Sequence, residues 1–397
     1  MPHTVAAPVV VVAPDSFKGS LTAEQAANAV AAGLRRVWHA AEIRIRPLAD
    51  GGEGTLDALL VNSGKRITQH VRNAAGEPHT AASGVLADQS AIVESAEIVG
   101  LTDAAGTRVP IEARSTLGLG DAIRAHLDQG RHRILVALGG SSTNDGGAGL
   151  LAALGVRLLD EDGAPLAPTP AAMERLAHID VSGLDTRLKH CELVAMTDVD
   201  NPLCGPHGAS AMFGPQKGAK PSQVAKLDHA LSHFADLLEA AIGKRVRELP
   251  GAGAAGGLGF ALHALGATFR PGAEIVAAEV GLDAALEGAD WLITGEGRSD
   301  EQTLHGKTPF VACAHARRAG VPATLLSGAI ATDALPALNQ YFSGCFSPTP
   351  GPMTLDAAIS GAETLLADGA EQLARLFDAA RGMKATKAMG EEGPTAE

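Results

Sequence analysis

The chain has 397 residues, of which 46% are hydrophobic, 19% charged and 3% aromatic. This length and apolar content indicate a globular protein with enough core for two domains. The 45 acidic residues outnumber the 32 Lys and Arg residues, and the formal net charge is −13. That balance argues against nucleic acid or an anionic membrane as a partner, because both require a basic surface.

The cysteines are scattered along the chain at Cys191, Cys204, Cys313 and Cys345, without a C-x-x-C pair. This spacing is typical of a reducing compartment and favours neither a disulfide framework nor a zinc site. The apolar run Val9–Ala13 is too short for a signal peptide or a membrane span. We therefore expect a cytoplasmic protein.

The run Val9–Ala13 is β-branched and of strand length, which is typical of a strand buried on both faces. The loop Asp15–Ser20 follows, and Thr22 with Gln25 forms the capping-box pattern that starts a helix. A short loop of this kind aims the ammonium of Lys18 over the sheet edge, where it can meet a phosphate as a point charge. A solvated loop lysine is the alternative.

A second strand is predicted over Ile43–Leu48, and the stretch Ala49–Thr55 joins it to a helix. Asp50 and Glu53 bracket two glycines there, so a turn presents carboxylates and backbone amides together at a helix start. The alternative is that both side chains only cap that helix. After a strand at Lys65–Arg72 the pattern loosens, and we expect a domain crossing near residue 80.

A glycine- and hydroxyl-rich turn, Gly139–Gly149, follows a buried strand at Arg133–Leu138 and precedes an apolar helix. Turns of this kind bring backbone N–H groups close to phosphates, and hydroxyl side chains add donors. Asn144 and Asp145 are candidates for holding a magnesium ion that bridges those phosphates. The alternative is that the glycines serve only tight packing between helix and strand.

Two acids, Asp198 and Asp200, follow the short strand Glu192–Met196 on a loop rich in proline and glycine. They are spaced to share a metal ion, or for one to act as a general base, although such acids are also ordinary in turns. Asp198 directly follows the strand, so its backbone is the better fixed of the two. Lys217 lies in a later turn that precedes a long amphipathic helix.

The segment Gly251–Gly256 matches the dinucleotide-binding pattern G-x-G-x-x-G, which would indicate a dehydrogenase. The mechanism of that motif requires an apolar strand before it. The preceding segment, Lys244–Pro250, is charged and ends in a proline, so the dehydrogenase hypothesis is the weaker one.

A polar loop follows the buried strand Trp291–Thr294 and leads into a helix near Pro309. Open α/β sheets place their chemistry on such loops, at the carboxyl ends of strands. Thr308 is a plausible N-cap with Pro309 at the first helical position, which sets Lys307 beside a positive helix end. The loop is not a nucleotide P-loop, because Glu301 stands where the first glycine belongs. A capped helix with solvated charges is the alternative.

Beyond this loop the chain alternates between helix and strand, with a final amphipathic helix from Leu355 to about Ala380. Residues 382–397 have no periodic apolar pattern, and we expect them to be a disordered tail.

Six ordered blocks of this sequence resemble the bacterial glycerate kinases of the type-one family, and the resemblance runs from about residue 9 to residue 380. The blocks are Asp15–Ser20, Ala49–Thr55, Gly139–Gly147, Thr197–Gly205, Phe213–Gly218 and Gly295–Thr308. The resemblance implies phosphoryl transfer from ATP, with Mg²⁺, to D-glycerate, giving 2-phosphoglycerate. Alternatives are a glycerate 3-kinase giving 3-phosphoglycerate, the dehydrogenase above, and a carboxylate-binding protein without catalysis.

The implied fold is α/β, with a Rossmann-like parallel-sheet domain formed by both chain ends and an inserted second α/β domain of mixed sheet. Together with the sequence pattern, it predicts a discontinuous domain of residues 1–80 and 290–381, an inserted domain of residues 81–289, and an active site in the cleft between them. The predicted partners are D-glycerate and ATP, and homo-oligomer formation is left open.

Residue roles are hypotheses drawn from the blocks. We expect Asp198 to be the catalytic base and Lys18 to stabilise the transferring group. The remaining candidates fall into three sets. Nucleotide binding is assigned to Gly139, Gly140, Ser141, Ser142, Asn144, Lys217, Lys307 and Thr308. Substrate binding is assigned to Asp15, Ser16, Asp50, Glu53 and Arg298. Magnesium binding is assigned to Asp145, Glu296 and Asp300.

Overall fold

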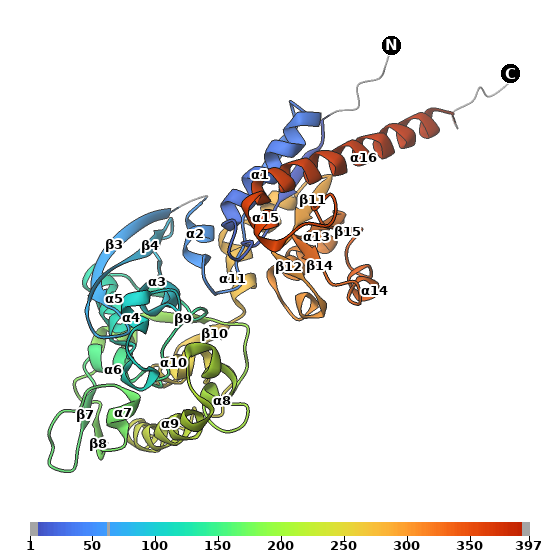
Figure 1. The fold of residues 1–397 in the computed structure, drawn as a ribbon. Coiled ribbons are helices and arrows are strands. Elements are labelled where there is room, and N and C mark those ends of the chain that lie inside the picture. The colour runs from blue at the N-terminus through green and yellow to red at the C-terminus, as the bar shows by residue number, and fades with distance from the viewer. Residues whose placement is uncertain (1–6, 62–63, 391–397) are drawn as a thin grey trace. The chain divides into compact units, whose positions relative to one another are not determined.

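The computed structural model describes residues 7–61 and 64–390, and it divides into two compact units (Figure 1). The first unit comprises residues 1–49 and 276–397, and the second comprises residues 50–275. These boundaries differ from the crossings predicted near residues 80 and 290. Residues 50–80 belong to the second unit because the strand Gly64–Arg72 pairs along nine residues with Pro78–Leu86 of the second sheet.

The first unit is built on a five-stranded sheet in the order β15-β13-β11-β1-β2. Every pairing in it is parallel. The chain leaves β1 toward β2 and leaves β11 toward β13, so the strand order reverses between β1 and β11, as in Rossmann-like folds. This confirms the predicted Rossmann-like domain. The strands are β1 (Val9–Val12), β2 (Glu42–Ile45), β11 (Trp291–Thr294), β13 (Ala323–Leu326) and β15 (Gly344–Phe346).

Helices flank this sheet, and a two-stranded ladder of β12 (Arg298–Ser299) with β14 (Ala329–Ile330) lies in the same unit. The helices are α1 (Ala23–Val37), α11 (Gly272–Glu279, which crosses the unit boundary), α12 (Leu282–Leu286), η4 (Glu301–Leu304), α13 (Thr308–Arg318), α14 (Leu335–Leu338), α15 (Leu355–Ser360) and α16 (Ala362–Gly390).

The start of α1 forms the predicted capping box. Gln25 N donates to Thr22 Oγ1 at 3.1 Å, and Thr22 N donates to Gln25 Oε1 at 2.9 Å. Helix α16 continues to Gly390, into the segment 382–397 that the sequence predicts as a tail. That segment is rich in Ala, Lys and Met, which have high helix propensity and need no apolar face to extend a helix already formed. Residues 391–397 lie outside the described part of the chain.

The second unit contains a six-stranded mixed sheet in the order β10-β9-β6-β5-β4-β3. Strands β10, β9, β6 and β5 are parallel, whereas β5 with β4 and β4 with β3 are antiparallel. This confirms the predicted inserted α/β domain of mixed sheet. The strands are β3 (Gly64–Arg72), β4 (Pro78–Leu86), β5 (Ala91–Glu94), β6 (Arg133–Ala137), β9 (Glu192–Met196) and β10 (Thr268–Arg270).

Helices cover this second sheet, and β7 (Arg157–Leu159) pairs with β8 (His178–Asp180) in a separate hairpin. They bury a large apolar core that includes Ile123, Ile134 and Phe234. The helices are α2 (Thr55–Leu60), α3 (Ser95–Val99), α4 (Ala104–Thr107), η1 (Ile111–Ala113), α5 (Leu117–Asp128), α6 (Ala148–Ala153), α7 (Pro170–Met173), η2 (Thr186–His190), α8 (Ala209–Phe213), η3 (Pro215–Lys217), α9 (Pro221–Ile242) and α10 (Ala254–Ala264).

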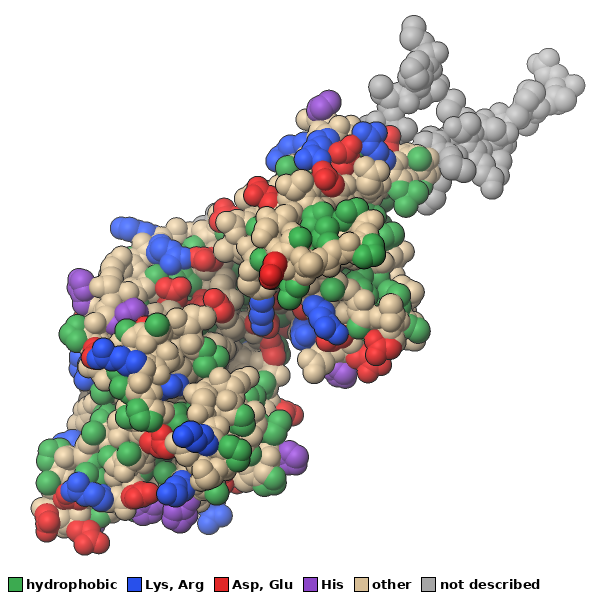
Figure 2. All heavy atoms as spheres, viewed as in Figure 1, with side chains coloured by type: hydrophobic (Ala, Val, Ile, Leu, Met, Phe, Trp, Pro, Cys, Tyr) green, Lys and Arg blue, Asp and Glu red, His purple; other side chains and the backbone are tan. Residues whose placement is uncertain are grey.

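Surface charge is mixed, and Figure 2 shows Lys and Arg side chains scattered among Asp and Glu on the face drawn, without one continuous basic patch. Within the described residues, no helix is both long enough and apolar enough to cross a membrane.

Helices α1 and α16 lie side by side (Figure 1), and their backbones are close at Gly33, where an added Cβ would lie 2.0 Å from the carbonyl oxygen of Ala367. We expect Gly33→Ala to lower the free energy of unfolding by about 1–3 kcal/mol, because the methyl group forces the helices apart. Helix propensity alone would give the opposite sign. Urea unfolding measures the change, with the exposed Ala32→Ser as control. A stabilised Gly33→Ala variant would contradict the packing described.

Candidate functional site

The candidate residues form two groups, one in each unit. In the second unit they lie at the carboxyl ends of parallel strands: Glu94 ends β5, Gly139 follows β6 and Asp198 follows β9. The carboxyl ends of parallel strands meet at one edge of a sheet, which is where α/β proteins bind ligands.

Asp198 stands beside two other acids. Its Oδ1 accepts a hydrogen bond of 3.0 Å from the backbone N–H of Gly272. Burial raises the pKa of Asp198 to about 7, the charges of Asp50 and Glu274 raise it further, and the Gly272 N–H opposes the rise. Asp198 as a whole residue is exposed to solvent, like Asp200, so solvent screens these interactions and weakens the rise. Asp200 is exposed two residues further along the loop.

The turn that carries Asp50 is held by close backbone contacts. Asp50 Oδ1 accepts a hydrogen bond from Gly52 N at 3.0 Å, and Gly51 O accepts one from Gly139 N at 3.0 Å. A Cβ at Gly272 would lie 2.1 Å from the carbonyl oxygen of Asp50. Glu53 is exposed at the start of α2. The structure thus brings Asp50, Asp198 and the beginning of the glycine-rich loop together.

Glu94 is a residue of this edge that the sequence pattern did not single out. It is buried, and its carboxylate accepts hydrogen bonds from Gly54 N at 3.0 Å and Leu56 N at 2.8 Å. Burial raises its pKa to about 7, although the two N–H groups oppose the rise. Glu94 therefore fixes the first turn of α2 directly after the Asp50 turn. A lone acid at the end of an apolar strand was the only available sequence signal.

The glycine-rich loop turns its polar side chains inward. Asp145 is fully buried, and its carboxylate accepts four hydrogen bonds: from Thr116 N at 2.7 Å, Thr116 Oγ1 at 2.9 Å, Gly147 N at 3.1 Å and Gly149 N at 3.1 Å. Burial raises its pKa. Both carboxylate oxygens accept hydrogen bonds within the protein, which fasten the loop to α6, and magnesium binding by Asp145 stays a prediction.

Other predicted phosphate ligands of this loop are also buried. Ser142 Oγ donates to Val99 O at 2.8 Å, and Asn144 Nδ2 donates to Ser210 Oγ at 2.9 Å. Gly139 and Gly140 remain partly exposed at the start of the loop. The part of the loop open to a ligand is therefore its first turn.

Lys217 lies beneath the same loop. Its Nζ donates to Thr143 O at 2.7 Å and to Ser141 Oγ at 3.1 Å. Burial lowers the pKa of Lys217 to about 7, the charge of Arg114 lowers it further, and that of Asp145 opposes the shift. These two hydrogen bonds brace the loop from inside, and a phosphate contact of Lys217 stays a prediction.

The segment Gly251–Gly256 packs against this loop as well. Among the described residues, no strand lies between α9, which ends at Ile242, and this segment. A Cβ at Gly256 would lie 2.0 Å from Thr143 O, and Gly146 N donates to Gly256 O at 3.0 Å. These glycines permit close packing of the segment against the loop. Because no strand leads into the segment, it lacks the structural context of a dinucleotide site.

In the first unit, the loops after β1 and β11 lie side by side at the point where the strand order reverses. Asp15 N donates to Gly295 O at 2.8 Å, and a Cβ at Gly297 would lie 3.4 Å from Lys18 N. Ser16 N donates to Asp15 Oδ1 at 2.6 Å, and the Lys18 side chain is exposed. The two loops therefore present their polar groups at one sheet edge.

The loop after β11 holds two acids around one lysine. Lys307 Nζ lies 4.0 Å from Glu296 Oε2 and 3.9 Å from Asp300 Oδ1. Glu296 Oε1 accepts hydrogen bonds from Thr303 Oγ1 at 2.7 Å and Ser299 Oγ at 3.0 Å, and burial raises the pKa of Glu296. This cluster can hold a cation between its carboxylates or an anion against its lysine.

The helix start in this loop differs by one residue from the prediction. Lys307, rather than Thr308, is the N-cap of α13, and Pro309 occupies its first turn. The side chain of Thr308 is buried. Arg298 is exposed on β12.

Two α/β units, each with its candidate residues at the carboxyl ends of parallel strands, define a ligand-binding α/β protein. The model of the glycerate kinase family matches residues 10–378. The chain belongs to the glycerate kinase family, and is therefore a kinase.

Relatives are similar over nearly their whole length. A protein named glycerate kinase from Bacillus subtilis is 43% identical over 388 residues, covering 96% of this chain and 99% of its own. Glycerate 2-kinase from Escherichia coli is 40% identical, covering 89% of this chain and 93% of its own. A solved structure of a proposed glycerate kinase 2 from Salmonella typhimurium LT2 superposes with a TM-score of 0.83 at 40% identity, covering 94% of this chain and 99% of that one.

Glu94 predicts a specific pH dependence of stability. Its pKa rises from an ordinary value of 4.5 to about 7 on folding, so the stability that its proton contributes is present below pH about 4.5 and lost as the pH rises through about 7. We expect wild type to lose up to about 3 kcal/mol relative to Glu94→Gln across this range. Urea unfolding of both proteins at several pH values measures the difference.

The exposed Glu174→Gln is the matched control and should follow wild type at every pH. Parallel profiles for wild type and Glu94→Gln would show that Glu94 titrates alike in the folded and unfolded chains.

Proposed function

We propose that this chain transfers the γ-phosphoryl group of ATP to the 2-hydroxyl of D-glycerate in a magnesium-dependent reaction. The observation that supports the chemistry most directly is the carboxyl of Asp198, whose pKa of about 7 suits a base that works near neutral pH. In the step, the hydroxyl oxygen bonds to the γ-phosphorus, the bond from that phosphorus to ADP breaks, and the hydroxyl proton passes to Asp198.

Phosphoryl transfer depends mainly on positioning and on charge stabilisation. In the second unit, the Gly272 N–H orients the Asp198 carboxylate, and the neighbouring Asp50 keeps its basicity high. In the first unit, Lys18 and Arg298 are exposed cations suited to phosphate or to the carboxylate of glycerate. Both units thus contribute residues to the proposed reaction.

When bound, Mg²⁺ neutralises charge on the phosphate oxygens of ATP. The described residues include no cluster of three or more His, Cys, Asp or Glu side chains that fits a metal ion. A nucleotide-bound Mg²⁺ needs only one or two protein carboxylates, because phosphates and water complete its shell. Glu296 and Asp300 suit this role, since both flank Lys307 at about ion-pair distance.

The position of phosphorylation rests on the name of the Escherichia coli relative, glycerate 2-kinase. Phosphorus NMR of the product distinguishes the alternatives, because the ester phosphorus of 2-phosphoglycerate has one proton on the adjacent carbon and that of 3-phosphoglycerate has two. A product with two such protons would overturn the proposed position while leaving the kinase assignment intact.

Asp198→Asn tests the base. The substitution keeps the size of the side chain and removes its proton-accepting charge, so we expect kcat to fall by about 10²-fold or more with little change in ATP affinity. In wild type, kcat should rise with pH through about 7 as Asp198 loses its proton. Steady-state kinetics of ADP release measures both effects.

Asp200→Asn is the matched control, since Asp200 is an exposed acid on the same loop. A larger loss of kcat in Asp200→Asn would reverse the two assignments. Loss of magnesium affinity in Asp198→Asn, with kcat retained at saturation, would make Asp198 a metal ligand.

Lys18→Ala tests the exposed cation of the β1 loop. If its ammonium stabilises charge in the transition state, kcat/KM should fall by about 10²-fold, because such electrostatic donors are worth several kcal/mol. The exposed Lys189→Ala serves as control for a general change in surface charge. Equal values of kcat/KM for Lys18→Ala and Lys189→Ala would show that Lys18 is an ordinary solvated lysine.

A further inference from the structure

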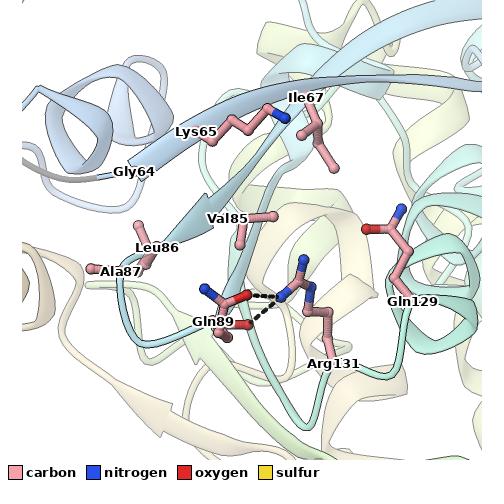
Figure 3. Close-up of a pocket in the computed structure, with 9 residues that line it drawn as sticks. All are labelled: Gly64, Lys65, Ile67, Val85, Leu86, Ala87, Gln89, Gln129 and Arg131. Atoms are coloured by element: carbon pink, nitrogen blue, oxygen red, sulfur yellow. Dashed lines mark hydrogen bonds between the residues drawn. The ribbon is translucent and has the colours of Figure 1, made fainter.

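A pocket of about 380 Å³ lies in the second unit, away from the residues discussed so far (Figure 3). It lies at the amino ends of β5 and β6, whereas Glu94 and Gly139 lie at their carboxyl ends. The start of β3, the end of β4 with the following turn, and the end of α5 form its walls. The lining residues are Gly64, Lys65, Ile67, Val85, Leu86, Ala87, Gln89, Gln129 and Arg131.

The side chains that line this pocket include hydrogen-bond donors and cations but no acid. Four of the nine residues carry side-chain N–H donors, namely Lys65, Gln89, Gln129 and Arg131, and none of the nine is acidic. Figure 3 shows these side chains around the pocket on three separate segments. Asp88 lies between Ala87 and Gln89 in the same turn, but its carboxylate accepts a hydrogen bond from Ser90 Oγ at 2.7 Å and pairs with Arg133 at 3.4 Å. Coulomb attraction there favours an anion.

The guanidinium of Arg131 is held in place. It donates through Nη1 to both the side-chain and the backbone oxygen of Gln89, as Figure 3 shows. Gln89 has a φ of 71°, a left-handed conformation that costs energy for a residue with a side chain. Nε of Arg131 is buried and has no hydrogen-bond partner among the described residues. The arginine is thus oriented in advance and keeps donor capacity.

The end of α5 explains only part of this arrangement. Cations at a helix carboxyl end offset the partial negative charge of its carbonyls, and Arg131 follows that end closely. Lys65 comes from β3, which is not part of that helix, and its side chain is exposed. The helix dipole therefore does not account for the second cation or for the apolar floor, to which Ile67 and Val85 contribute side chains on one face of the sheet.

We propose that this pocket binds a small organic anion, with a phosphate or carboxylate group against Lys65 and Arg131 and a short carbon chain against the apolar floor. Its volume of about 380 Å³ is large enough for such a ligand. The site is separate from the catalytic residues proposed above and does not depend on their assignment.

Isothermal titration with glycerol phosphate, in the absence of ATP and glycerate, tests the proposal. This probe has the phosphate and the short chain but lacks the carboxylate of glycerate. We expect Lys65→Gln to weaken one binding event by at least about 10-fold, whereas the exposed Lys189→Gln leaves it unchanged. Lys65 is exposed at a strand end, so the variant should keep the fold, which circular dichroism checks.

A parallel titration with inorganic phosphate, which has no carbon chain, measures the contribution of the phosphate charge alone. A parallel titration with malonate shows whether a carboxylate can replace the phosphate. Absence of binding by all three probes, or equal affinity in wild type and Lys65→Gln, would overturn the proposal. Loss of kinase activity in other variants would have no bearing on this result, because no catalytic step is measured.

Discussion

The site edge of the second unit depends on backbone segments that approach more closely than any side chain allows. A Cβ at Gly139 would lie 2.4 Å from the Cα of Gly52, and a Cβ at Gly272 would lie 2.1 Å from the carbonyl oxygen of Asp50. Contacts this short exclude every residue but glycine. They fix the Asp50 turn, the glycine-rich loop and the start of α11 as one body, on which the Asp198 carboxylate depends for its orientation.

Buried charge is the second feature of this edge. Asp145 is a buried residue of the glycine-rich loop, Lys217 is buried against the same loop, and Glu94 is buried against the segment that follows the Asp50 turn. Burying an ion is costly unless hydrogen bonds replace its hydration, and each of these groups makes at least two. Each one also connects a loop to a rigid element. The arrangement shapes the loops from inside and leaves their outer backbone for a ligand.

The fold was largely predictable from the sequence because local signals agree with the global arrangement. The β-branched run of β1 and the capping box of α1 need no long-range information. The site was predictable only to the level of its loops. Spacing places Asp145 and Lys217 on loops but cannot show which way they face, since their partners lie far away in the chain, at Thr116 for Asp145 and Thr143 for Lys217. Glu94 is bound by a turn 40 residues away, which no local pattern reports.

The central position of β1 has a consequence for synthesis on the ribosome. Thr294 Oγ1 donates to Ala13 O across 281 residues, so at roughly 5–20 residues per second β1 waits about 14–56 s for its neighbour β11. The inserted unit is complete before that neighbour emerges. During this interval, four consecutive valines at Val9–Val12 have an unpaired strand edge, which exposes this segment to mispairing with other chains and to aggregation.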